Sequence, residues 1–136
     1  MALREKGKYH YGDSQEDLAL ALKKYAESNQ YSINEVRDIK CDKCGWDTFK
    51  LFSDDDESGA MCRCVHCSEK KFIRDSEEYM NQDETDYHEC MCGNANLSIS
   101  VGLSFYEGTK DARWIYVGGY CATCGVVGNY IDWNER

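Results

Sequence analysis

Apolar side chains recur at helical spacing near the start of the chain. Between residues 15 and 28, three of them fall on one face of a helix: Leu18, Leu22 and Tyr25. Ser14 stands in the N-cap position, and Asp17 stands in the first turn, near the positive end of the helix dipole. The pattern predicts one helix over 15–28 that covers one side of a small domain, with a docking helix for a partner as the alternative.

Beyond this helix, apolar and polar positions alternate with a period of two, which is typical of strands with one buried face. In the first half of the chain the alternation predicts strands near 48–53 and 59–64, with a polar turn between them. In the second half, "LSISVGLSF" and "RWIYVGGYC" predict two strands around the polar turn "YEGTKDA". Each half therefore predicts an antiparallel hairpin.

The second hairpin allows two registers. Alternate positions of its first strand are large and apolar, whereas the positions between them are serine or glycine. We favour the register that packs Trp114 and Tyr116 against Leu103 and Phe105. A slip of one residue would move both aromatic side chains over the serines and create an exposed platform for a protein partner.

The two halves look like two copies of one unit. Each starts with a cysteine pair followed by glycine ("CDKCG" and "CMCG"), continues into a hairpin, and returns through a second pair ("CVHC" and "CATC"). We expect an N-terminal helical segment (1–35), a first unit (36–82) and a second unit (87–136), with an acidic linker between the units. The sequence contains no proline, so glycine, asparagine and aspartate form the turns.

The chain has nine cysteines, and eight of them pair up with the spacing of metal ligands. In the first unit 19 residues separate the two C-x-x-C pairs, which lies within the spacing typical of a four-cysteine zinc site. The second unit departs from this pattern, because its first pair is C-x-C and 28 residues separate its two pairs. We expect two structural Zn²⁺ ions with eight thiolate ligands: Cys41, Cys44, Cys64, Cys67, Cys90, Cys92, Cys121 and Cys124.

Two further residues bear on which side chains bind the metal ions: His88 and Cys62. His88 could replace one sulfur in the second site. Cys62 is expected to remain a free thiol, either as a small buried apolar side chain or as a reactive group.

Both units resemble zinc ribbons, whose cysteine turns are related to the knuckles of rubredoxins. Residues 36–136 are also similar to an uncharacterised bacterial family of tandem zinc ribbons, through "DDDE", "FIRDSEEY", "RWIYVG" and "GNYIDW". This resemblance implies a bacterial source and adds no activity. The expected fold is small, metal-stabilised and mainly β: two tandem zinc ribbons, each an antiparallel hairpin, preceded by an N-terminal helix.

Charge narrows the class of partner. The chain carries 16 basic and 25 acidic side chains, a formal charge of −9, and the excess acid lies in the cysteine-bearing region. A nucleic-acid surface should be basic instead. The carboxylates of residues 54–57 are expected to be solvated at a hairpin tip, with a Ca²⁺ or Mg²⁺ site as the alternative.

The sequence contains no catalytic constellation, since four sulfurs can close each metal site and only three histidines are present. We therefore expect no enzyme, but an acidic zinc-binding protein-interaction module that docks or neutralises a basic protein, as immunity proteins and antitoxins do. The alternatives are a nucleic-acid-associated zinc ribbon that uses Lys70, Lys71 and Arg74, and a rubredoxin-like iron protein that transfers electrons.

The expected location is the cytoplasm, because the N-terminus has mixed charge and no apolar run that resembles a signal peptide. No stretch approaches the roughly 18 apolar residues of a membrane span. The oligomeric state does not follow from the sequence.

Overall fold

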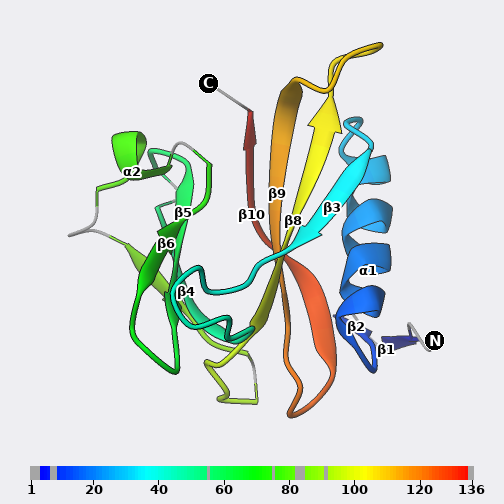
Figure 1. Cartoon of the computed structure of the whole chain (residues 1–136). Coiled ribbons are helices and arrows are strands. Elements are labelled where there is room, and N and C mark those ends of the chain that lie inside the picture. The colour runs from blue at the N-terminus through cyan, green and yellow to red at the C-terminus, as the bar shows by residue number, and fades with distance from the viewer. Residues whose placement is uncertain are drawn as a thin grey trace.

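Two antiparallel sheets and one long helix make up the chain in the computed structural model, which describes residues 4–6, 9–54, 56–74, 76–81, 85–90 and 92–134. The helix α1 (Gln15–Ser28) lies on one face of a six-stranded sheet, and a four-stranded sheet lies on the other side (Figure 1). The predicted helix is confirmed, as is the mainly β architecture that follows it. No helix in the described ranges is both long and apolar enough to cross a membrane.

The large sheet has the order β1-β2-β10-β9-β8-β3. Its strands are β1 (Arg4–Lys6), β2 (Tyr9–Tyr11), β3 (Glu35–Asp38), β8 (Ser98–Phe105), β9 (Ala112–Tyr120) and β10 (Val126–Asn134). The small sheet has the order β6-β5-β4-β7, with β4 (Phe49–Asp54), β5 (Gly59–Cys64), β6 (Lys70–Phe72) and β7 (Asp86–His88). A one-turn helix, α2 (Ser76–Tyr79), follows β6. Both predicted hairpins are confirmed, as β4–β5 and β8–β9.

The two units have the same plan, and they exchange strands. In each unit a cysteine pair leads into three antiparallel strands in the order β6-β5-β4 or β10-β9-β8. The strand that leads into the first unit, β3, pairs with β8 of the second unit, whereas β7, which leads into the second unit, pairs with β4 of the first. The predicted division into 1–35, 36–82 and 87–136 stays a prediction, and strand pairing crosses it.

A pseudo-twofold relation follows from the registers. Phe49 and Leu97, each five residues after the second cysteine of a leading pair, bond to each other through both of their N–H and C=O groups at 2.8 Å. Ile39 and His88 each precede a leading pair by two residues, and they stand opposite Ile99 and Leu51, which are themselves equivalent. The described structure thus resembles an isologous dimer whose two copies are joined in one chain.

The main core lies between the two sheets. The large sheet contributes Ile99, Val101, Leu103, Ile115, Val117, Ile131 and Trp133, and the small sheet contributes Phe49, Leu51, Ala60, Cys62 and Cys64. Leu97, just before β8, joins the same core. One cysteine from every pair is also buried in this cluster or at its edge. The core and the sulfur groups are therefore continuous, so loss of either would disturb the other.

The favoured register of the β8–β9 hairpin is wrong. Trp114 stands opposite Ser104, and Tyr116 stands opposite Gly102, so both aromatic side chains share the face of the serines. The exposed platform that we linked to the alternative register is absent as well, because α1 and the segment after it cover this face. Tyr116 is fully buried, and Trp114 stacks on Tyr31 with ring centroids 4.5 Å apart.

Small residues under α1 explain this register. A Cβ atom on Gly118 would lie 2.6 Å from Leu22 Cδ2 and 3.0 Å from Leu18 Cδ1, so a larger residue at this position would push the helix away from the sheet. At the start of the helix, Ser14 is the N-cap residue without a side-chain cap bond. The buried Asp17 carboxylate accepts the N–H of Asp13 at 2.7 Å instead.

Candidate metal centres

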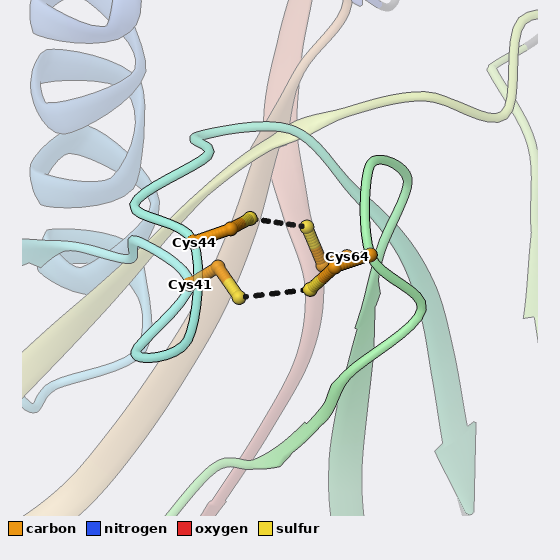
Figure 2. A group of neighbouring side chains, drawn as sticks. Cys41, Cys44 and Cys64 are labelled. Carbon is orange, nitrogen blue, oxygen red and sulfur yellow. Dashed lines mark hydrogen bonds between the residues drawn. The ribbon is translucent and has the colours of Figure 1, made fainter.

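The first group of sulfurs joins the loop before β4 to the β5–β6 turn. Cys41 and Cys44 point from that loop toward Cys64 at the start of the turn (Figure 2). Cys67, in the same turn, completes the group. Cys41 Sγ lies 3.5 Å from Cys67 Sγ, and Cys44 Sγ lies 3.6 Å from Cys64 Sγ. The sequence-predicted residues of the first site are thus brought together.

The second group repeats this arrangement on the large sheet. Cys90 and Cys92 precede β8, and Cys121 and Cys124 form the β9–β10 turn. The distance from Cys90 Sγ to Cys124 Sγ is 3.3 Å, and that from Cys92 Sγ to Cys121 Sγ is 3.6 Å. The shorter C-x-C spacing therefore still delivers both sulfurs to one point.

These distances suit a metal ion rather than a disulfide. All ligand atoms within each group lie within 4.8 Å of one another, and none of the nine cysteines forms a disulfide. Four sulfurs at about 2.3 Å from a tetrahedral Zn²⁺ ion would lie about 3.8 Å apart, whereas a disulfide needs about 2.05 Å. Within the described residues, these two four-cysteine groups are the clusters that could hold a metal, and they suggest tandem zinc-binding sites.

The backbone of each cysteine turn closes in the same way. The N–H that follows the pair donates to the carbonyl of its first cysteine, as in Gly45 to Cys41 and Gly125 to Cys121 at 2.8 and 2.7 Å. Three turns reverse at a glycine with positive φ: Gly45 at 76°, Gly93 at 92° and Gly125 at 88°. The fourth turn places Ser68 at φ 67°, a conformation that costs a side-chain-bearing residue about 1 kcal/mol.

Backbone N–H groups also point at the sulfurs and favour thiolate. The N–H groups of Cys44 and Lys43 lower the pKa of Cys41 to about 7 against the effect of desolvation. Burial opposes ionisation of Cys121, but Asn94 Nδ2 at 3.3 Å and the N–H groups of the turn outweigh it and lower the pKa to about 6. Each group thus holds one cysteine that ionises readily near neutral pH.

Two further cysteines of each group have a raised pKa and resist ionisation beside that thiolate: Cys44, Cys67, Cys90 and Cys124. Burial and the three neighbouring sulfurs raise the pKa of Cys90 well above its ordinary value. A divalent cation removes this repulsion, because it neutralises the charge that accumulates as further thiols ionise. The donor set fits Zn²⁺, and four sulfurs in one group leave no coordination position for a substrate.

His88 lies outside the second group, so the alternative with histidine as a ligand is wrong. Its Nε2 atom lies 2.6 Å from Ser53 Oγ, and its ring packs edge-on against Tyr130 with centroids 5.2 Å apart. His88 belongs to β7 and faces β4, because strand exchange carries it to the other sheet. The local sequence around His88 does not predict this long-range pairing.

Cys62 is outside both groups, as predicted. It is fully buried in β5, and burial raises the pKa of its thiol to about 12. Of the two interpretations, the small buried apolar side chain is the one that the geometry supports.

Two tryptophans, Trp46 and Trp133, differ in exposure. Trp133 is buried in the core between the sheets. Trp46 remains 46% exposed and stacks on His66 with ring centroids 4.7 Å apart, so it bridges the two turns of the first group from outside.

The carboxylate expected at the tip of the first hairpin is not solvated. Asp54 is only 4% exposed, and its carboxylate accepts the N–H groups of Asp56, Glu57 and Asn81 at 3.1, 3.2 and 2.8 Å. These bonds, led by that from Asn81, lower the pKa of the Asp54 carboxyl. Asp54 thus ties the turn to the segment after α2, while the neighbouring residue 55 lies outside the described residues.

Comparison of the chain with protein-family models, with curated proteins and with solved structures finds no match. The assignment of the two four-cysteine groups therefore rests on their own geometry: matched turns, sulfurs within bonding range of one ion, and N–H groups that stabilise thiolate.

Proposed function

We propose that the protein is a non-catalytic binding module built from two tandem zinc ribbons, with one structural Zn²⁺ in each four-cysteine group. The observation that carries this proposal is the repeated order of cysteine turn, hairpin, cysteine turn and third strand in both units. This order is the plan of a zinc ribbon. Closed four-sulfur sites favour a structural role for the metal over catalysis.

Metal content tests this proposal. Elemental analysis of the purified chain should find two zinc ions per molecule, and Cys44→Ser and Cys92→Ser should each remove about one of them. Cys62→Ser is the matched control, because Cys62 lies outside both groups, and it should retain both ions. Iron with its visible absorption, or well under one zinc per site in the unmodified chain, would refute the assignment.

For the partner, we propose a basic protein, in the manner of an immunity protein or antitoxin. The support is the formal charge of −9, to which two four-thiolate zinc sites would add further negative charge. A cationic probe such as decalysine should bind with an affinity that falls as salt rises, because exposed charges are then screened. Binding that is absent at low salt, or indifferent to salt, would contradict this proposal.

A second candidate is nucleic-acid association, which the predicted basic residues favour. Lys71 and Arg74 line one surface groove, and Lys70 lines an adjoining one. Lys71 Nζ is already bonded to Asp42 at 2.8 Å, which reduces the charge that it can offer. An electrophoretic shift of DNA or RNA at low salt, lost in Lys70→Glu, would favour this candidate over the basic partner.

A further inference from the structure

A groove of about 450 Å³ opens between the two sheets on the side where β3 and β6 form their edges. Its floor consists of apolar side chains from both sheets and from the segments after β3 and β6: Ile39, Phe72, Ile73, Val101 and Leu103. Arg37 stands opposite Val101 and so shares the inward face of the large sheet, where its guanidinium pairs with Glu35 of the same strand. Lys71 stands opposite the buried Cys62, on the inward face of the small sheet.

The groove lies at a place where the two sides of the molecule related by the pseudo-twofold axis carry different residues. The equivalents of Ile39 and Ile73 on the opposite side are His88 and Tyr130, counted from the same cysteines. There the two rings meet at 5.2 Å and occupy the space between the sheets. The aliphatic pair is smaller than the aromatic pair, so it leaves room for the groove on this side.

The charges of the side chains also differ between the two equivalent sides. Four basic side chains and two acidic side chains line the groove. The basic ones are Arg37, Lys40, Lys71 and Arg74, and the acidic ones are Asp38 and Asp42. The positions equivalent to Arg37 and Lys40 carry Asp86 and Glu89, so the sign is reversed on the opposite side. In a chain with a formal charge of −9, four cations around one apolar floor form a local basic site.

Part of this positive charge is available to a ligand. Asp42 accepts a bond from Lys71, and Asp38 accepts one from Ser100 Oγ at 2.8 Å. Within the described ranges, the Lys40 ammonium group has no hydrogen bond or ion pair, and it is exposed. An anionic group above the floor could therefore be bound without breaking an existing contact of Lys40.

We propose that this groove binds an extended peptide segment of a partner protein in which acidic side chains alternate with apolar ones. Such a segment matches both the apolar floor and the basic rim. The bordering strands, β3 and β6, each pair on one side only among the described residues, so their backbone groups can bond to an added strand. Nucleic acid fits less well, because the floor offers a single aromatic side chain, Phe72, for base stacking. The groove is locally basic, so its ligand differs from the basic partner proposed above, and the proposal does not depend on which metal is bound.

The test uses the full metal-loaded chain and a fluorescein-labelled eight-residue peptide that alternates glutamate and valine. Binding is measured by fluorescence anisotropy at low and high salt. We expect salt-dependent binding that weakens at least about tenfold in the double variant Arg37→Glu, Lys40→Glu. Lys110→Glu, which changes an exposed lysine in the β8–β9 turn outside the groove, is the matched control and should bind as the parent does.

A second variant tests the apolar floor without a change of charge. Ile39→Phe places an aromatic ring where the opposite side of the molecule already accommodates His88, so we expect it to fold, as judged by its circular dichroism and zinc content. It should weaken peptide binding about tenfold or more by filling the groove. Retained binding in both variants would overturn the proposal. So would the absence of binding in the parent, or tighter binding of an eight-nucleotide oligothymidylate, which would assign the groove to nucleic acid.

Discussion

Substitution of Asp54 by alanine should destabilise the protein more than any other change to an acidic side chain of the first hairpin. The substitution removes one charged acceptor from three backbone N–H groups, of which that of Asn81 is the closest at 2.8 Å. A hydrogen bond to a charged group contributes about 1.5–3 kcal/mol, and the other two N–H groups share one oxygen at longer distances. We expect Asp54→Ala to lower the free energy of unfolding by about 3 kcal/mol, a large part of the 5–15 kcal/mol of an ordinary domain.

The sign of the pH dependence follows from the lowered pKa of Asp54. The folded state binds this proton less readily than the unfolded state, so the stabilisation is fully present above the ordinary carboxyl pKa of 3.8, which the unfolded chain retains. It is lost as pH falls through the lower pKa of the folded state. Acid also protonates the cysteine thiolates, but the parent and the variant share that effect, so their difference in stability isolates Asp54.

The difference in stability between the parent and Asp54→Ala can be measured by urea denaturation of the zinc-loaded chain. The measurement is made at pH 7 and at several values between pH 5 and pH 3. Asp56→Ala is the matched control, because Asp56 is exposed in the same turn and should change the stability by less than about 0.5 kcal/mol. A cost below about 1 kcal/mol for Asp54→Ala at neutral pH would refute the reasoning. A difference that stays constant down to pH 3 would refute it as well.

Three further changes follow from the described contacts. Ser68→Gly should raise the free energy of unfolding by about 0.5–1 kcal/mol in the zinc-loaded chain, measured by urea denaturation, because glycine tolerates the positive φ of the fourth cysteine turn. Gly118→Ala should lower it by about 1–3 kcal/mol, because the new Cβ would overlap Leu22 and displace α1; an unchanged midpoint would show that the helix can move without cost. The Cys62 thiol should resist iodoacetamide at pH 8 until the metal is chelated, as read by mass spectrometry, because the thiol is buried and its pKa is about 12; rapid labelling of the loaded chain would contradict this.

The helix, the two hairpins and the four-cysteine groups could be predicted from the sequence, because local patterns determine them. The helix over 15–28 and the two hairpins follow from periodicity, because burial of one face imposes a period of 3.6 or 2 on the residues involved. The four-cysteine groups follow from spacing, because a short turn can aim two sulfurs at one ion whether it has one or two intervening residues. The same reasoning correctly left Cys62 outside both groups.

Long-range pairing escaped prediction. The strands β3 and β7 are four and three residues long, too short for a periodic signal, and each pairs with the unit to which it does not lead. The register of β8 and β9 was misjudged because alternation is identical in both registers. The choice depends on α1 fitting over Gly118 and on Ile33, after the helix, fitting over Gly102. The burial of Asp54 depends on the segment after α2, which lies far from it in the sequence.

The exchange of β3 and β7 has a consequence for how the chain can be divided. Each unit supplies the strand that completes the other's sheet, so a fragment cut between them would keep a donor strand and lose its acceptor. Two copies of such a fragment could restore the pairing only by meeting in solution. In the intact chain a short connection holds the second unit at millimolar effective concentration, so each copy closes on itself before it can swap strands with a neighbour.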